Sequence, residues 1–274
     1  MNQHAILVLT HKPIEHIKKY AVNNPHINFY IHFDKKYNIN NLKISQYSNI
    51  FLLPDSYRIN ITWAGFTMVQ AMINLFNFAL NHDPHNNFFH IISGDDAILD
   101  SFFSDSLDLN QIYMECIESP RHRYRVRFNT IHADTRHQRK FYGKALTVLY
   151  KIFDKLLPSR QICLFGSQWF SISRSHLQIL MSSIDEKYLN KFKKKLCPDE
   201  HFFQYLVKKN NLTTHLSQEG NKRYIYFDKN YQHGSSPIWL NISTVRNANE
   251  NKYWFCRKVQ SDVIHQLIKE QSLK

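Results

Sequence analysis

The chain has 274 residues, 43% of them hydrophobic and 14% aromatic, with only six glycines, which indicates a folded globule and excludes a flexible string of domains. A formal charge of +13 favours an anionic partner: a nucleotide, nucleic acid, an acidic glycan or a membrane surface. We find no long apolar run, signal peptide, internal repeat, linker or CxxC pairing. We therefore expect one cytoplasmic domain over residues 1–274 with reduced cysteines.

The first forty residues have the pattern of a βαβ unit. Residues 5–9 and 27–33 form two apolar runs of strand length, and Pro13 can start a helix between them. Such runs are typical of parallel strands buried on both faces. His11 and Asp34 follow the two strands, at the edge where open α/β sheets bind ligands. A carboxylate there often holds a ribose hydroxyl, although the GxGxxG motif of dinucleotide folds is absent.

Two further strands and a long helix are predicted next. We expect strands at residues 50–53 and 88–92, with Arg58 in a polar loop, and a helix over residues 63–80 whose apolar stripe, starting at Trp63, packs in the core. Ser93-Gly94-Asp95-Asp96 follows the fourth strand and superficially resembles an acidic metal motif. Since a strict Asp-x-Asp is absent, we expect no metal here. Gly94 instead lets the backbone approach a ligand, with one acid beside it.

An arginine-rich segment follows a short strand at residues 112–115. Arg123 and Arg125 belong to four arginines that alternate between residues 121 and 127, after Glu115 and Glu118. A solvated basic face, nucleic-acid binding and recognition of a polar substrate all fit such a run. Because the run is short and isolated, we favour substrate recognition by fixed guanidinium groups. We interpret residues 129–155 as a basic surface helix or ordered loop that holds no metal.

The second half contains the strongest candidates for chemistry. Gly166-Ser167 leads into a strand with Trp169, which either packs in the core or lines a sugar cleft with its ring. Pro198-Asp199-Glu200 starts a helix, and its two carboxylates either stabilise that helix start or place Glu200 in a cleft as a catalytic base. A strand at 223–227, a closing segment at 253–258 and an amphipathic helix at 259–273 complete the chain.

The order and spacing of these motifs resemble the core-2/I-branching β-1,6-N-acetylglucosaminyltransferases and their peptide O-xylosyltransferase relatives. The resemblance covers residues 5 to about 259. It rests on Leu-Thr-His-Lys at 9–12, Ile-His-Phe-Asp-Lys-Lys at 31–36, Trp63, Ile-Ser-Gly-Asp-Asp at 92–96, Gly-Ser-Gln-Trp-Phe at 166–170, Pro-Asp-Glu at 198–200, Arg-Tyr-Ile at 223–225 and Phe-Cys-Arg-Lys at 255–258.

The resemblance implies an α/β, GT-A-like glycosyltransferase fold with a central, mostly parallel sheet flanked by helices. It also implies metal-independent, inverting transfer from a UDP-sugar, with Glu200 deprotonating the acceptor hydroxyl. Lys258 would hold the diphosphate, together with Arg246 or, failing that, Arg257. We assign to donor binding His11, Asp34, Arg58, Gly94, Asp96, Arg246, Arg257 and Lys258. We assign to acceptor binding Glu115, Arg123, Arg125, Trp169, Asp199 and Tyr226.

The chemistry is consistent with that family. Inversion needs one base opposite the departing UDP, and general-base catalysis contributes roughly 10²–10⁴-fold. Preorganised Lys and Arg can neutralise the leaving diphosphate in place of a metal. We therefore expect no cofactor or metal.

The leading hypothesis is transfer of N-acetylglucosamine from UDP-GlcNAc to a bacterial lipo-oligosaccharide or similar surface glycan. UDP-xylose or another UDP-hexose is the nearest alternative donor. A basic nucleic-acid-binding protein, which would give Glu200 no role, and an inactive glycan-binding protein are alternatives of another class. Basic charge could also dock the protein on anionic lipid at the inner face of the cytoplasmic membrane, provided that this charge clusters in space.

Overall fold

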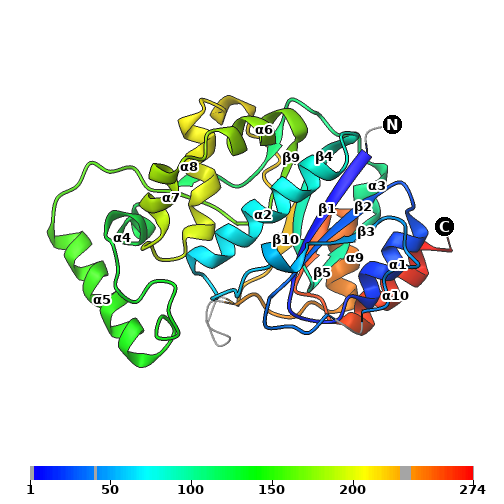
Figure 1. Ribbon diagram of the computed structural model, residues 1–274, viewed down its shortest axis with the longest axis horizontal. Coiled ribbons are helices and arrows are strands. Elements are labelled where there is room, and N and C mark those ends of the chain that lie inside the picture. The colour runs from blue at the N-terminus through cyan, green and yellow to red at the C-terminus, as the bar shows by residue number, and fades with distance from the viewer. Residues whose placement is uncertain (1–2, 40–41, 229–235, 274) are drawn as a thin grey trace.

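The computed structural model describes residues 3–39, 42–228 and 236–273, and its centre is a six-stranded sheet (Figure 1). The strand order is β3-β2-β1-β4-β9-β6. The first four are parallel, whereas β9 runs antiparallel to both of its neighbours. The strands are β1 (Gln3–Thr10), β2 (Asn28–Phe33), β3 (Ile50–Leu52), β4 (Asn86–Ser93), β6 (Ile112–Tyr113) and β9 (Ser171–Ser173).

Residues 5–9 of β1 are all apolar because both faces of this strand are buried. Ala5, Leu7 and Leu9 pack into the core on one face of the sheet, while Ile6 and Val8 pack into the core on the other. Successive side chains of a strand point to opposite faces, so a strand covered on both sides needs no polar residue.

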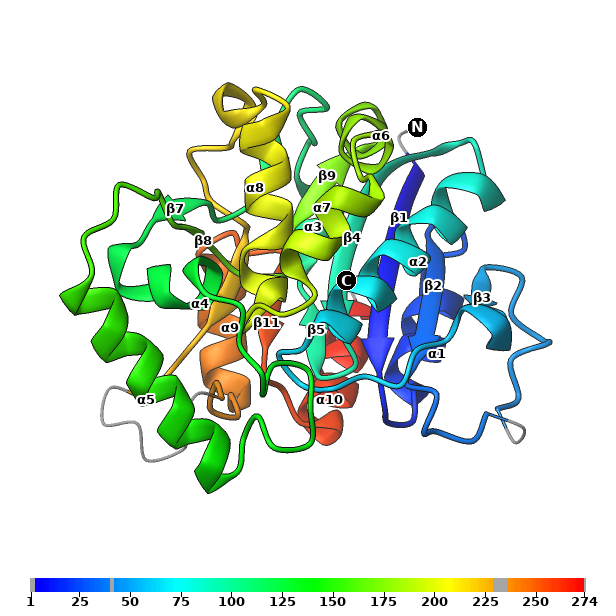
Figure 2. The same ribbon diagram turned by 60° about the vertical axis from the view of Figure 1, so that its left-hand side comes forward.

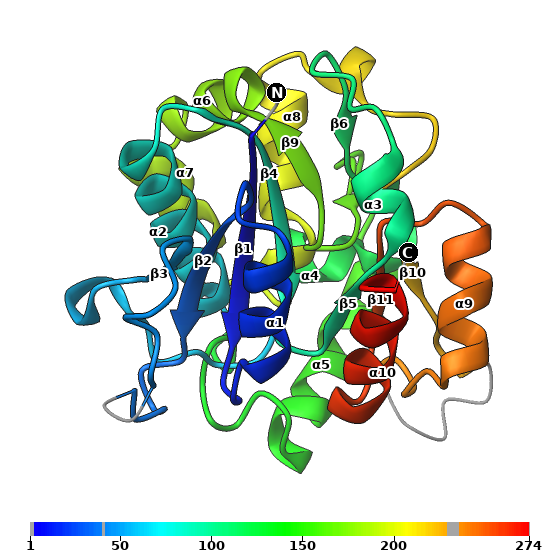
Figure 3. The same ribbon diagram turned by 90° about the vertical axis from the view of Figure 1, so that its right-hand side faces the viewer.

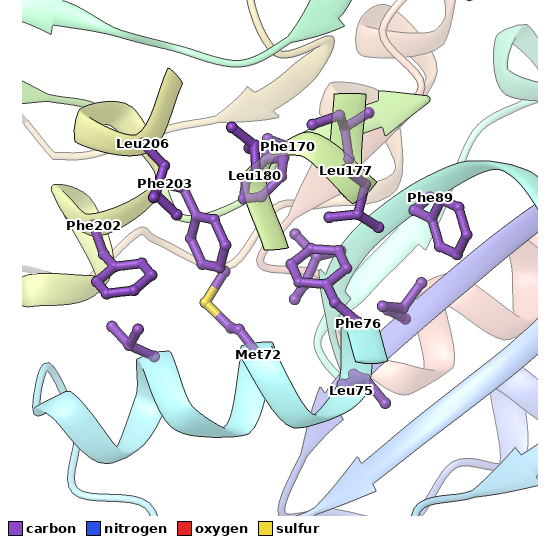
Figure 4. Packing of buried hydrophobic residues seen from close by; sticks show 14 of the residues in the cluster. Met72, Leu75, Phe76, Phe89, Phe170, Leu177, Leu180, Phe202, Phe203 and Leu206 are labelled. Carbon is purple, nitrogen blue, oxygen red and sulfur yellow. The ribbon is translucent and has the colours of Figure 1, made fainter. Parts of the chain in front are cut away.

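The first face is covered by helices whose aromatic side chains interlock (Figure 4). Phe76 lies 5.6 Å from Phe203 between ring centroids, and Phe203 lies 5.2 Å from Phe170 of the sheet. This packing fixes the helix that immediately follows Glu200. The helices are α2 (Phe66–His82), α6 (Arg174–Ser182), α7 (Glu186–Phe192) and α8 (Phe202–Lys209).

The opposite face carries three helices and a small second sheet. Figure 3 shows α1 and α10 side by side in front of the main sheet. The second sheet has the order β10-β11-β5, and its register pairs Arg257 with Asp96. These elements are α1 (Glu15–Asn23), α9 (Ile242–Glu250), α10 (Ser261–Gln271), β5 (Asp96–Ile98), β10 (Arg223–Ile225) and β11 (Phe255–Arg257), with α3 (Asp100–Ser104) beside them.

A further group of elements forms one end of the molecule. There α5 lies beyond α4, away from the main sheet (Figures 1 and 2). These elements are β7 (Ile117–Glu118), β8 (Leu164–Phe165), α4 (Arg123–Arg127), α5 (Phe141–Leu156) and the 3₁₀ turn η2 (Pro120–His122). Three other 3₁₀ turns lie elsewhere along the chain: η1 (Asp55–Tyr57) after β3, η3 (Pro198–Glu200) before α8 and η4 (Thr213–His215) after α8.

The architecture confirms the prediction of an α/β, GT-A-like fold with a mostly parallel central sheet. The alternating arginines lie on η2 and α4 and not on a strand. The placement of Trp63 in the core was wrong, because it precedes α2 and is 44% exposed. The apolar spacing of residues 63–80 extends one turn beyond the start of α2 at Phe66, so this spacing alone does not show where the helix begins.

Candidate functional site

A pocket of about 970 Å³ opens at the carboxyl edge of the main sheet. Its wall contains the acidic residues Glu115 and Glu200, the aromatic Trp169 and the basic residues Arg257 and Lys258. Seven segments contribute to the wall, within residues 63–68, 114–117, 165–169, 199–200, 213–227, 236–237 and 253–258. The sequence-predicted residues that line the pocket are Glu115, Trp169, Asp199, Glu200, Arg257 and Lys258.

A tight turn presents Glu200 to this pocket. Cys197 adopts a left-handed backbone conformation with φ 47°, and Pro198 then begins η3. The Glu200 amide donates to the Cys197 carbonyl at 3.1 Å. A non-glycine residue with positive φ is uncommon and often marks a functional turn. The chain therefore turns sharply just before the carboxylate that sequence analysis singled out.

Gly166 holds the pocket wall together. Its amide donates to the Glu200 carbonyl at 3.0 Å, and a Cβ at this position would lie only 1.7 Å from the Glu115 carbonyl oxygen. The Ser167 amide donates to the Glu115 carboxylate at 2.9 Å. Only glycine permits this close approach. The segment thus fixes Glu115 and Glu200 relative to each other through the backbone.

The Glu200 carboxylate forms an ion pair with Arg125 of α4. The side chain of Arg125 is 18% exposed and that of Glu200 is 35% exposed, so the Glu200 carboxylate still reaches the pocket. The guanidinium carbon of Arg125 also lies 5.8 Å from the centre of the Phe165 ring. Arg125 therefore orients Glu200, and it is absent from the pocket wall itself.

Asp199 differs sharply from its neighbour Glu200. Its carboxyl is buried, and its Oδ1 has no hydrogen-bond partner among the described residues. Burial, together with the negative charge of Glu200, raises the pKa of Asp199 to about 8. At neutral pH the pair thus consists of a protonated Asp199 beside Glu200. A neutral carboxyl at this position can donate a hydrogen bond into the pocket.

Trp169 is stacked against Arg257. The guanidinium carbon of Arg257 lies 4.1 Å from the centre of the indole ring, close enough for a cation–π interaction. Trp169 packs with the core and also lines the pocket, and its contact with a sugar stays a prediction. Nε and Nη1 of Arg257 make no hydrogen bond with the described residues. A buried guanidinium with spare donors is suited to an anionic ligand.

Basic side chains gather beside Arg257. Nζ of Lys12 lies 5.1 Å and Nζ of Lys258 lies 5.7 Å from the centre of the Trp239 ring, so both lysines approach one indole. Lys12 pairs with Asp95 at 2.8 Å. Burial lowers the pKa of Lys258, and nearby Arg257 and Lys12 act in the same direction, although Asp95 opposes them. An anion placed here would relieve the repulsion among three cations.

The ends of β1, β2 and β4 meet beside this basic group. The Asp34 amide donates to the Thr10 carbonyl at 2.8 Å, and the Gly94 amide donates to the Leu9 carbonyl at 3.0 Å. His11 is exposed at the same edge. The structure therefore brings His11, Asp34 and Gly94 together at one sheet edge, outside the wall of the pocket.

Three residues that were predicted to bind the donor make close contacts within the protein, and their donor role stays a prediction. Arg58 is buried and donates to the carbonyls of Phe33, Asp34 and Tyr37, so it holds the loop that carries Asp34. A Cβ on Gly94 would lie 2.3 Å from Oγ1 of Thr10, so glycine is required by strand packing. Asp96 is 1% exposed and accepts hydrogen bonds from Ser93. It also lies 3.6 Å from Nε of Arg257, which it positions from behind.

Three other predicted residues are not brought to the pocket. Arg246 is exposed on α9 and pairs with Glu270 of α10. Arg123 points to Asp154 of α5 at 3.0 Å. Tyr226 is absent from the wall, whereas residues 225 and 227 line it, as expected where side chains alternate along extended backbone. The structure thus gives Arg257, and not Arg246, the position beside Lys258.

Two carboxylates that follow β4, those of Asp95 and Asp96, contact basic groups and a hydroxyl. Asp95 pairs with Lys12, and Asp96 is bound by Ser93 and lies near Arg257. Within the described ranges, no three His, Cys, Asp or Glu side chains come together in a way that could hold a metal ion.

Sequence reasoning missed three residues of this region. Lys12 belongs to the Leu-Thr-His-Lys motif and could have been found there. Trp63 lines the pocket although its spacing suggested the core. Nothing in the sequence marks Trp239, whose role arises because it lies between two lysines.

Comparison with models of protein families gives a match over most of the chain. The family model described as Core-2/I-Branching enzyme matches residues 5–251, nearly the whole chain. None of the curated protein sequences matches the chain.

Proposed function

The chain belongs to the Core-2/I-Branching enzyme family and is therefore a glycosyltransferase, and we propose that it transfers N-acetylglucosamine from UDP-GlcNAc to a glycan hydroxyl with inversion. The observation that carries this proposal is the placement of Glu200. Its carboxylate reaches the same 970 Å³ pocket as the unsatisfied guanidinium of Arg257 and the amine of Lys258. A carboxylate that can act as a base and cationic groups that can bind an anion therefore line the same pocket.

The reaction needs three events at these groups. The acceptor hydroxyl oxygen attacks the anomeric carbon while the Glu200 carboxylate takes its proton. The bond from that carbon to the diphosphate oxygen breaks, and UDP leaves with the electron pair. Negative charge grows on the leaving diphosphate, where Lys258, Arg257 and Lys12 stabilise it. Asp34 and His11, at the adjacent strand ends, suit the nucleoside part of the donor.

The remaining groups position the acceptor and the base. Arg125 holds the Glu200 carboxylate, so the base is oriented before substrate arrives. The protonated carboxyl of Asp199 can donate to an acceptor oxygen. The exposed part of the Trp169 ring can pack on the C–H face of a sugar. The acceptor class that we propose is a lipo-oligosaccharide or another surface glycan, because a chain of charge +13 suits an anionic glycan.

We propose that no metal takes part. Asp95 and Asp96 are paired with Lys12 and Arg257, and these cations supply the positive charge that a metal would otherwise bring.

The test is turnover of UDP-GlcNAc, UDP-xylose, UDP-galactose and UDP-glucose by the purified protein, measured with and without EDTA. We expect turnover of UDP-GlcNAc that EDTA does not reduce. Preference for another UDP-sugar would change the transferred sugar in this proposal but would not contradict the mechanism. Loss of activity in EDTA with recovery in Mn²⁺ would refute the metal-free mechanism. UDP binding with no turnover of any donor, even with glycan acceptors, would refute the enzyme.

A further inference from the structure

The helix α5 presents an apolar face to solvent. Phe141, Val148, Ile152 and Leu156 fall on one stripe, spaced by seven, four and four residues along the helix. Phe141 is 88% exposed and Leu156 is 71% exposed. Neighbouring exposed apolar residues widen this stripe, namely Tyr142, Leu149 and Phe153.

The opposite face of α5, which contacts the protein, mixes polar and apolar residues: Gly143 and Asp154 are buried, and Leu146, Thr147 and Tyr150 are half-buried. A Cβ on Gly143 would lie 2.2 Å from the His137 carbonyl oxygen, so the helix packs closely on this side. Asp154 pairs with both Arg123 and Arg127 of α4. Most of the apolar side chains of α5 thus face solvent, whereas the helices of globular proteins normally turn their apolar face inward.

The exposed charges of α5 and its N-cap are all positive. Lys140, Lys144, Lys151 and Lys155 follow one another along a flank of the apolar stripe, and all four are exposed. The only carboxylate within α5 is the buried Asp154. An apolar face bordered by a row of lysines has the chemistry of an anionic lipid surface, with acyl chains beneath and phosphates beside.

We propose that α5 is a membrane-docking helix, which lies in the plane of an anionic phospholipid surface with its apolar stripe among the acyl chains. None of the helices in the described part of the chain has the length and hydrophobicity of a membrane-spanning segment. With 16 residues and a charged flank, α5 suits the interface instead. A second copy of this chain is disfavoured as the occupant, because two-fold pairing would place like-charged lysine rows against each other.

Docking through α5 would bring the pocket to the lipid. Arg123 and Arg127 of α4 hold Asp154 of α5, while Arg125 of the same short helix pairs with Glu200. Figures 1 and 2 show α4 between α5 and the body of the molecule. This step rests on the proposed function: a base joined through α4 to the docking helix suits an acceptor carried on a lipid. The docking itself does not depend on catalysis.

The experiment is sedimentation of the whole protein with vesicles of phosphatidylcholine alone and with vesicles that also contain phosphatidylglycerol. We expect binding to the anionic vesicles that weakens as salt is raised, and little binding to the neutral ones. Equal binding to both, or binding to neither, would overturn the proposal. UDP-sugar turnover without acceptor or vesicles is measured separately, so failure of docking and failure of the proposed function are distinguishable.

Matched variants assign the binding to α5. Leu149→Glu with Ile152→Glu should weaken vesicle binding at least tenfold, whereas Val22→Glu, at an exposed site on α1, should not. Reversal to Glu of Lys144, Lys151 and Lys155 should also weaken binding, since each basic side chain contributes roughly fivefold. The control reversal uses the exposed Lys19, Lys187 and Lys193.

Circular dichroism checks that each variant is folded, which surface substitutions should permit. Unchanged vesicle binding by the α5 variants would overturn the proposal. So would a wild-type dimer in solution that the α5 variants dissociate, because the apolar face would then belong to a second copy.

Discussion

Replacing Asp199 by Asn should make the protein more stable, and more so as the pH rises. The structure buries this carboxyl next to Glu200 and leaves its Oδ1 without a hydrogen-bond partner among the described residues. Its pKa is raised from 3.8 to about 8 by burial and by the Glu200 charge. An Asn side chain has the same shape as a protonated Asp and never ionises.

The magnitude follows from proton linkage. At low pH the carboxyl is protonated in both the folded and the unfolded chain, and it costs nothing. Above pH 3.8 the unfolded chain releases this proton while the folded chain retains it until about pH 8. The free energy of unfolding therefore falls with rising pH by about 1.4 kcal/mol per pH unit through this window. Between about pH 5 and about pH 7, Asp199→Asn should gain about 3 kcal/mol relative to the wild type.

Urea unfolding of both proteins across this pH range is the assay. The comparison of variant with wild type cancels every other group that titrates independently. Asp262→Asn, at an exposed position on α10, is the control and should show no such pH dependence. A constant difference between Asp199→Asn and wild type from about pH 5 to about pH 7 would contradict the burial argument.

Two further predictions concern the donor group and the pocket wall. Lys258→Ala should weaken UDP binding by roughly tenfold to a hundredfold, since a hydrogen bond to a charged group contributes about 1.5–3 kcal/mol. Calorimetry measures the affinity for UDP, and Lys19→Ala is the control. Wild-type affinity of Lys258→Ala would show that Lys258 does not bind the diphosphate. Gly166→Ala should destabilise the fold by about 1–3 kcal/mol, because its Cβ would meet the Glu115 carbonyl at 1.7 Å. If Gly166→Ala unfolds in urea like the wild type, the backbone around Glu115 can move to accept the added Cβ, and this prediction is wrong.

The fold was predictable from the sequence because buried strands consist of continuous runs of apolar residues. The continuous apolar runs at residues 5–9 and 27–33 identified β1 and β2, and burial on both faces is why no alternation appears there. The alternation of the arginines did not reveal their secondary structure, and the segment folds as η2 and α4. Arg123 pairs with Asp154, thirty-one residues further along the chain, and no local pattern predicts this contact.

Residues of the candidate site could be predicted where they belong to a sequence motif. They could not be predicted where their position depends on tertiary contacts. Pro198-Asp199-Glu200 and Arg257-Lys258 were found as motifs, and the structure places Asp199, Glu200, Arg257 and Lys258 on one pocket wall. The resemblance favoured Arg246 over Arg257 as the second basic residue at the diphosphate. Arg246 of α9 pairs with Glu270 of α10, and no local sequence pattern predicts this tertiary contact.

Arg58 shows the same limit for buried groups. A buried arginine that holds carbonyls and an exposed arginine that binds a ligand look alike in a sequence. Only the hydrogen bonds from Arg58 to the loop around Asp34 separate the two roles.

Single-turnover transfer by Glu200→Gln tests the central claim most directly. The amide keeps the shape of the side chain and removes its basicity, so transfer should fall by roughly 10²–10⁴-fold while UDP binds as tightly as before. Glu118→Gln, at an exposed glutamate outside the pocket wall, should transfer at the wild-type rate. Transfer by Glu200→Gln within a few fold of wild type would contradict the assignment of Glu200 as the base.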